Sequence, residues 1–295
     1  MWCMMRVMEL RQLKSFVVVA EELNVGRAAI RLHLTQPSLS RQIAALEHDL
    51  GVELFARVKR RFVLTAAGAA FLADAQELLR RADEAVRTAQ RTHRGELGTL
   101  RLRFVQSATF EALPRLLGAF RAAYPEVVLD LETMTTLRQA DALRDGRIDV
   151  GLLRLPAAEP GLSSRVVSHD PLVVALPAGH RLAKRKRIGL ADLAEETFVL
   201  YTQASGPSVH ETIVGYCRAA GFVPRIVQEG ADVQTIVALV AAGLGVSLLI
   251  APTPPIDPEA VVYRKLSDDL PPWQLSVAWS PDNHSPVLER FLQLV

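Results

Sequence analysis

The chain has 295 residues, of which 49% are hydrophobic and 22% are charged. This composition is typical of a packed globular protein and excludes a disordered or collagen-like one, and at about 100 to 200 residues per domain the length suggests two or three domains. The two cysteines, Cys3 and Cys217, can neither form a disulfide framework nor supply a zinc site, so we expect a reducing compartment and no bound metal.

The sequence shows no targeting or membrane signal. The N-terminus lacks the apolar core of about 7 to 15 residues that a secretory signal needs, and we assign no function to residues 1–7. The longest apolar run, residues 236–251, is shorter than the roughly 20 residues of a membrane helix and contains two glycines. We therefore expect a cytoplasmic protein with no membrane partner.

Charge is distributed unevenly along the chain. Residues 1–95 hold 15 lysines and arginines against 10 acidic residues, a net charge of +5, whereas residues 96–295 hold 19 against 22, a net charge of −3. A small basic module followed by a larger, slightly acidic one suggests a nucleic-acid-binding module joined to another domain.

Three short helices are predicted at the front of the chain. Apolar residues recur at helical spacing over residues 10–20, 25–32 and 39–50. Asn24 can cap the second helix, Pro37 suits the first turn of the third, and Gly51 can end it. Because residues 33–35 alone separate the second and third helices, the pattern predicts a helix-turn-helix, which places the start of its second helix in the major groove of DNA.

Polar side chains are predicted on the face of the third helix opposite its leucines. They offer an amide, hydroxyls and a guanidinium, which suit base edges and phosphates. Two β-rich runs then flank a basic segment, which predicts a wing whose cations contact phosphate. The residues expected at the DNA are Thr35, Gln36, Pro37, Ser38, Ser40, Arg41, Arg57, Lys59 and Arg60. Taken alone, Thr35 also fits an ordinary helix cap and Arg41 a solvated surface residue.

These segments resemble the DNA-binding domain of the LysR-type transcriptional regulators. The similar segments are residues 8–16, 28–29, 34–43, 46–47, 50–55 and 64–68, which include Leu34-Thr35-Gln36-Pro37-Ser38-Leu39-Ser40-Arg41-Gln42-Ile43. The resemblance implies that Gln36, Ser38, Arg41 and the wing contact DNA. The wing tip departs from the family, since many members have Arg-Gly where this chain has Arg60-Arg61.

A long linker helix is predicted from Thr65, a suitable N-cap, to about Arg94. Its apolar residues alternate at spacings of four and three: Phe71, Ala75, Leu78, Ala82, Ala85 and Ala89, widened by Leu72, Leu79 and Val86. At 1.5 Å per residue the helix is roughly 40 Å long, and it carries a stripe that needs a partner. The stripe can pack on the rest of the chain or on a second copy, and the linker position and small alanines favour a dimer. Gly95 and Gly98 mark its end.

The rear of the chain alternates β-rich and helical segments. Buried strands are predicted over residues 100–105, 127–131, 148–153, 173–176, 198–200, 225–227 and 246–250, with helices over 113–124, 137–145, 209–220 and 233–242. A later strand over 275–279 and a helix over 287–294 close the domain. The alternation predicts parallel sheets with crossover helices, in which ligands bind at the carboxyl ends of the strands.

Several strand-to-helix junctions are rich in hydroxyl and amide side chains. Free N–H groups at helix starts, joined by hydroxyl donors, can hold a carboxylate, although each junction alone also fits an ordinary helix cap. Arg154 could add an anion contact or form a surface salt bridge. The candidate effector-binding residues are Gln106, Ser107, Thr109, Thr136, Arg154, Thr202, Gln203 and Ser205.

The rear half is similar to the effector domain of the same family, which has two lobes like the periplasmic binding proteins. The similar segments include residues 146–151, and Ser107, Thr136 and Thr202 fall where those regulators line the cleft. The resemblance implies a first lobe over about 98–167 and 268–295 and a second over about 168–267. Details such as Met134-Thr135-Thr136 and Gly151-Leu152-Leu153-Arg154 look closest to members that sense aromatic-degradation products.

The expected protein is a ligand-responsive transcriptional regulator without enzymatic activity or cofactor. It has a winged helix-turn-helix over residues 8–65, a dimerising linker helix over 66–95 and a two-lobed α/β effector domain over 98–295. The expected partners are double-stranded promoter DNA, an aromatic or dicarboxylic acid and further copies of the chain. The family implies a homotetramer, a dimer of dimers, that contacts RNA polymerase if it is an activator.

Three other functions fit the sequence less well. A hydrolase using Ser107 needs a base within hydrogen-bond reach, and the sequence places none nearby. A transport binding protein would leave the front ninety residues unexplained, and an architectural DNA-binding protein would leave the cleft without a purpose. The basic segment of residues 181–187 fits a solvated loop better than a second DNA contact.

Overall fold

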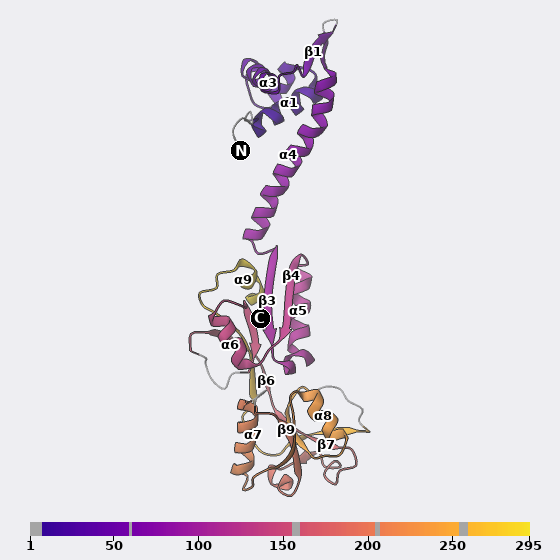
Figure 1. The fold of residues 1–295 in the computed structure, drawn as a ribbon, viewed down its shortest axis with the longest axis vertical. Helices are drawn as coiled ribbons and strands as arrows, with labels where there is room; N and C mark the ends of the chain where they lie inside the picture. The colour runs from indigo at the N-terminus through magenta and orange to yellow at the C-terminus, as the bar shows by residue number, and fades with distance from the viewer. Residues whose placement is uncertain (1–7, 59–60, 155–159, 204–206, 254–258) are drawn as a thin grey trace. The chain divides into compact units, whose positions relative to one another are not determined.

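The computed structural model describes residues 8–58, 61–154, 160–203, 207–253 and 259–295 (Figure 1). The chain forms two compact units, which divide between Gln90 and Arg91. Within the described ranges, no helix combines the length and the apolar character that crossing a membrane requires.

The first unit contains three short helices, a hairpin and most of a long helix. They are α1 (Leu10–Glu22), α2 (Val25–Arg31), α3 (Gln36–Leu50), β1 (Phe55–Val58), β2 (Arg61–Leu64) and α4 (Ala66–His93). The two strands pair antiparallel, with Phe55 opposite Leu64. The winged helix-turn-helix and the long linker helix predicted from the sequence are therefore confirmed.

The helix ends follow the local chemistry of the sequence. The Asn24 side chain accepts hydrogen bonds from the backbone N–H groups of Gly26 and Arg27, 2.9 and 3.1 Å away, and so caps α2. The Gly68 N–H donates to Thr65 Oγ1 over 2.9 Å at the start of α4. Gly51 ends α3 in the left-handed conformation, with φ of +72°, which glycine adopts without a steric penalty.

An aromatic cluster holds the wing and the start of α4 against the helices. Phe16 of α1 is fully buried, and its ring centroid lies 5.4 Å from that of Phe55 and 5.2 Å from that of Phe71. Leu39 and Leu46 of α3 point into the same core, so the opposite face of α3 is left at the surface. The core therefore determines which side chains of α3 are available to a partner.

The apolar stripe of α4 divides into two parts. The residues in its first half that pack against the core of the first unit are Phe71, Leu72, Ala75 and Leu79. Leu78 and Val86 stay 42% and 55% exposed, and Ala85 and Ala89 are exposed beside them. The sequence allowed the stripe to pack on the rest of the chain or on a second copy. One half of the stripe packs on the chain's own core, and the other half is exposed and can meet a second copy.

The first lobe of the second unit is a five-stranded sheet with the order β4-β3-β5-β13-β6. Its strands are β3 (Gly98–Phe104), β4 (Val127–Thr133), β5 (Val150–Leu153), β6 (Ser163–Asp170) and β13 (Trp273–Trp279). Its helical elements are η1 (Gln106–Phe110), α5 (Ala112–Ala123), α6 (Thr136–Arg144) and α9 (Pro286–Leu292). Helices α5 and α9 share one core with β3, and α6 packs with Leu153 of β5 and Ala278 of β13 in another. The central strands are therefore covered by helices, whereas Val128 and Leu131 of the edge strand β4 stay exposed.

The second lobe holds a four-stranded sheet with the order β11-β7-β12-β8 and a parallel pair β10-β9. Its strands are β7 (Leu172–Pro177), β8 (Arg187–Ile188), β9 (Thr197–Tyr201), β10 (Arg225–Gly230), β11 (Ser247–Ile250) and β12 (Val261–Leu266). Its helical elements are η2 (Leu190–Leu193), α7 (Pro207–Ala219) and α8 (Val233–Ala241). The chain passes from the first lobe to the second between Asp170 and Leu172, and it returns between Leu266 and Trp273.

The two-lobed α/β fold class is confirmed, but the prediction of parallel sheets holds only in part, because the main sheet of each lobe is mixed. Strands β4, β3 and β5 run parallel, whereas β13 pairs antiparallel with both β5 and β6. In the second lobe β7 pairs antiparallel with β11 and β12. The strands that carry the chain out of and back into each lobe must run opposite to one another, and this long-range requirement leaves no local pattern in the sequence.

Asp149 anchors the start of β5 to the neighbouring strand. Its carboxylate accepts hydrogen bonds from the Arg101 backbone N–H at 2.8 Å, from the Arg101 guanidinium at 2.9 Å and from Asn283 Nδ2 at 3.2 Å. Burial alone would raise the pKa of Asp149, but these hydrogen bonds outweigh it and lower the pKa. The aspartate in the segment 146–151 therefore has a structural role in this chain.

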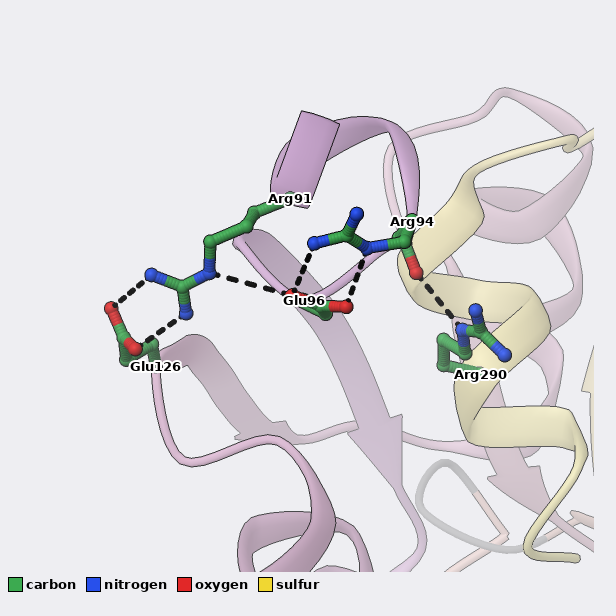
Figure 2. A network of polar contacts seen from close by, with 5 residues as sticks. All are labelled: Arg91, Arg94, Glu96, Glu126 and Arg290. Carbon is green, nitrogen blue, oxygen red and sulfur yellow. Dashed lines mark hydrogen bonds and ion pairs between the residues drawn. The ribbon is translucent and has the colours of Figure 1, made fainter. Parts of the chain in front are cut away.

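Polar contacts bind the beginning of the second unit to its body (Figure 2). The Glu96 carboxylate accepts hydrogen bonds from Arg94 at 2.7 Å and Arg91 at 3.4 Å, which lower the pKa of Glu96. Arg91 also pairs with Glu126, and Arg290 Nε donates to the Arg94 carbonyl at 2.9 Å. Residues 91–96 are therefore held by α9 and by the turn before β4.

Two glycine substitutions test the packing with opposite expected signs. A Cβ at Gly68 would lie 2.1 Å from the Leu54 carbonyl oxygen, so Gly68→Ala should destabilise the first unit by about 1–3 kcal/mol. Gly118 of α5 is exposed with open space around it, so Gly118→Ala should stabilise the second unit by about 0.5–1 kcal/mol. Urea denaturation followed by circular dichroism measures both. A stable Gly68→Ala protein would contradict the close contact.

Candidate functional site

A cavity of about 250 Å³ lies between the two lobes of the second unit. It is lined by Val105, Gln106, Ser107, Thr133, Met134, Thr135, Thr136, Leu137, Arg154, Tyr201, Val209, Ala231, Asp232, Val233, Ile250 and Trp273. Strands β4, β3 and β5 are parallel neighbours, so their carboxyl ends meet at one edge of the sheet and bring Ser107, Thr136 and Arg154 together.

Two hydroxyl groups are oriented by their contacts with Arg154. Arg154 Nε donates to Ser107 Oγ at 3.0 Å, and the Arg154 backbone N–H donates to Thr136 Oγ1 at 3.3 Å. Each hydroxyl oxygen acts as the acceptor in these bonds, so each keeps its own proton for another acceptor. Thr136 is also the first residue of α6, where backbone N–H groups favour an anion. The arrangement suits a carboxylate.

The Arg154 guanidinium is almost fully buried and neutralised by Asp170. Arg154 is 6% exposed, and its Nη2 donates to Asp170 Oδ2 at 2.7 Å. Ser168 Oγ donates to the same oxygen at 3.2 Å. Burial lowers the pKa of Arg154, and the contact with Asp170 opposes this change. The cavity wall therefore contains a paired cation and not a free one.

The remaining wall combines apolar and aromatic side chains with one acid. Tyr201 is largely buried, and burial raises the pKa of its hydroxyl; Arg154 lowers that pKa and Asp232 raises it. The phenol is therefore within the electrostatic influence of a cation in the first lobe and an anion in the second. Asp232 caps α8, since its Oδ1 accepts a hydrogen bond from the Thr235 N–H at 2.8 Å.

A second candidate site is the outer face of α3 in the first unit. Thr35, Gln36, Pro37, Ser40 and Arg41 are exposed and Ser38 is half-buried, while the leucine face is turned inward. Arg41 Nε donates to the Pro37 carbonyl at 3.3 Å, so the guanidinium lies over the first turn of its own helix. Arg57 is exposed on β1, and the predicted contacts Lys59 and Arg60 lie outside the described residues.

Both halves of the chain match families of one regulator class. Residues 10–69 match the bacterial regulatory helix-turn-helix protein, lysR family, and residues 93–295 match the LysR substrate binding domain. The chain belongs to the LysR family of transcriptional regulators. It is 37% identical to the HTH-type transcriptional regulator AlsR of Bacillus subtilis (strain 168), covering 97% of this chain and 95% of AlsR. It is also 37% identical to the Hca operon transcriptional activator HcaR of Escherichia coli (strain K12), and the match covers 98% of this chain and 97% of HcaR.

Solved structures of LysR-family regulators show the same fold. The crystal structure of CbnR superposes with a TM-score of 0.87 at 33% identity, covering 97% of this chain and 99% of CbnR. Full-length CbnR complexed with its target DNA gives a TM-score of 0.84 at 32% identity, covering 98% of each chain. This LysR-family regulator is therefore a DNA-binding protein with an effector-binding domain.

The relatives are named transcriptional regulators and not enzymes. The geometry around Ser107 agrees with this, because a serine nucleophile needs a base that accepts its proton. Within the described residues, Ser107 contacts Arg154 Nε, which is a donor without an acceptor lone pair. A hydrolase that uses Ser107 receives no support from this contact.

Half of the candidate effector residues of this LysR-family regulator line the cavity. Gln106, Ser107, Thr136 and Arg154 do so. Thr109, which donates to the Gln106 carbonyl at 2.7 Å, is absent from the lining, as are Thr202 and Gln203, and Ser205 lies outside the described residues.

Sequence reasoning missed the residues of the second lobe and of the crossover that line the cavity, since it placed the second-lobe contacts at Thr202, Gln203 and Ser205. Tyr201 stands at the end of a predicted strand, and Asp232 is a typical helix cap before a predicted helix; these signals could have indicated them. Trp273 could not be found from local pattern, because the sequence suggests no reason for it to meet residues 106–154.

Removing Asp170 should expose the cost of the buried cation. Asp170→Asn leaves the Arg154 charge without its anion, so the second unit should lose about 3–5 kcal/mol of stability, measured by urea denaturation. The double variant Arg154→Met, Asp170→Leu should recover most of that loss. Asp145→Asn is the matched control, since Asp145 pairs with Arg147 at the surface with 60% and 59% exposed side chains. Equal losses for Asp170→Asn and Asp145→Asn would contradict the burial argument.

Proposed function

We propose that this regulator responds to a small carboxylic acid that binds in the cavity between its lobes. The observation that carries the proposal is the pair of hydroxyls, Ser107 and Thr136, whose protons are left free by their contacts with Arg154. Together with the first turn of α6 they can donate to both oxygens of a carboxylate. A ligand that prefers one closure of the lobes would shift the population of regulator states.

The acid is aromatic or dicarboxylic in this proposal. The apolar and aromatic wall, which includes Tyr201, Trp273 and Met134, suits a flat apolar body of the size that about 250 Å³ admits. The resemblance of residues 134–136 and 151–154 to members that sense aromatic-degradation products supports the same class. Failure of every aromatic acid and muconate-like diacid to bind would remove this assignment.

In this proposal the three segments of the chain have separate roles. Residues 8–65 would read promoter DNA, with Gln36, Ser38 and Arg41 at the groove and Arg57, Lys59 and Arg60 at phosphates. Residues 66–95 would dimerise, and residues 98–295 would bind effector. The full-length CbnR structure with its target DNA supports the first assignment by similarity.

The uncovered half of the α4 stripe supports self-association. Leu78, Ala85, Val86 and Ala89 form a narrow apolar seam whose small residues permit close approach of a second helix. A dimer on a two-fold axis matches a palindromic operator, and the family resemblance extends this to a homotetramer. Contact with RNA polymerase follows if the protein activates transcription.

Arg41→Ala should weaken binding to the DNA just upstream of the gene by about tenfold or more, because a guanidinium contact is lost. Effector affinity should not change, because Arg41 lies in the first unit. A gel-shift titration at several salt concentrations and calorimetry with effector give the two measurements. Equal loss in both would argue against separate modules.

Ser107→Ala should have the opposite effect. It removes one hydroxyl of the carboxylate site and leaves the DNA-binding face unchanged, so the response to inducer should disappear while the gel shift without effector persists. Benzoate, salicylate and cis,cis-muconate serve as probe acids. Unchanged inducer response in Ser107→Ala would overturn the proposed carboxylate site.

Val86→Glu should dissociate the dimer, because it places a charge in the exposed seam. Arg87→Glu introduces the same residue outside the seam and is the matched control. Sedimentation velocity measures the oligomeric state of both variants at equal concentration. A dimer of unchanged stability in Val86→Glu would contradict the role of α4.

A further inference from the structure

Two buried donors in the cavity wall have no hydrogen-bond partner within the described part of the chain. They are Arg154 Nη1 and Trp273 Nε1, and both residues line the cavity. An unpaired buried donor is costly, and native proteins pair almost all such groups. Because both residues line the cavity, a molecule bound there can supply the acceptors that these two donors lack.

Trp273 occupies a special place in the fold. It is the first residue of β13, it faces Asp170 in the β13–β6 register, and Asp170 is the partner of Arg154. The strand belongs to the first lobe, whereas the indole packs against the apolar core of the second lobe. The side chain thus lies where the chain crosses between lobes, beside the buried cation.

We propose that Trp273 is a specificity-determining residue whose indole N–H donates a hydrogen bond to an oxygen of the bound effector other than the carboxylate held by Ser107 and Thr136. The inference rests on the proposed function, since it takes the carboxylic acid as the occupant of the cavity. The indole N–H is a donor only, so the group that meets it must be an acceptor: a hydroxyl, a carbonyl or a second carboxylate.

The consequence is a preference between closely related acids. A site built to hydrogen-bond a polar group rejects the analogue that lacks the group, because the buried donor is left unpaired. An acid with a second oxygen in reach of Trp273 should therefore bind about tenfold or more tightly than the analogue without it. Benzoate, which has a single carboxylate and no other oxygen, is the reference analogue.

The test uses the full-length protein and a defined panel of acids. The panel contains benzoate, its three monohydroxy derivatives, the three benzenedicarboxylates and cis,cis-muconate, each titrated by calorimetry. Trp273→Phe keeps an aromatic ring against the second-lobe core and removes the N–H donor, and its thermal midpoint confirms that the fold is retained. We expect it to lose about tenfold in affinity for the acid that binds best and little for benzoate.

Trp279→Phe is the matched control. Trp279 lies on the same strand, packs against the first-lobe core and is not among the described residues that line the cavity. Its substitution should leave all affinities unchanged. In a Trp2→Phe background, the change in tryptophan emission on binding should persist in Trp279→Phe and vanish in Trp273→Phe.

The outcomes separate this inference from the proposed function. If Trp273→Phe binds every acid as the wild type does, or weakens benzoate as much as the others, the hydrogen-bond assignment is wrong, while a loss of binding in Ser107→Ala keeps the proposed function. If Ser107→Ala binds the acids unchanged, the proposed function fails and this inference fails with it. If no acid in the panel binds the wild type, the aromatic or dicarboxylic assignment is removed and this inference is removed with it.

Discussion

The buried guanidinium of Arg154 is the constraint on which the effector domain depends. A cation that is 6% exposed requires an anion and further acceptors, and it finds them in Asp170 and Ser107. Asp170 ends β6, the strand that leads out of the first lobe, and Ser107 follows β3. One side chain thus joins the edge of the sheet, the crossover between lobes and the cavity wall.

Part of the positive charge of the first unit is neutralised by ion pairs within the unit. Two arginines of α2 are paired, Arg27 with Glu22 at 3.1 Å and Arg31 with Glu21 at 2.7 Å. These exposed pairs contribute little stability, but they reduce the free positive charge on α2. Under the proposed function, the basic groups offered to DNA are therefore those of α3 and the wing and not Arg27 and Arg31.

Helix α4 shows how one repeat can serve two packing functions. The residues near its start complete the core around Phe16 and Phe71, whereas Leu78, Ala85, Val86 and Ala89 stay at the surface. A periodic pattern reports that a stripe is apolar, but it does not state what covers each part of the stripe. The core of the first unit covers only the part of the stripe that its helices can contact.

The sequence by itself determined most of the local elements of this protein, although it did not indicate β6, β8 or β12. The helices of the front unit, their caps at Asn24 and Gly51, the hairpin and the long linker follow from periodicity and turn chemistry, which act over a few residues. The hydroxyl-rich ends of β3 and β4 and Arg154 after β5 could also be found, because parallel neighbouring strands bring their carboxyl ends together. Local sequence patterns could not indicate the antiparallel return of β13, the pairing of Arg154 with Asp170, or the presence of Trp273 and Tyr201 at the same cavity. Those features depend on contacts between segments far apart in the chain, and only the tertiary fold brings such segments together.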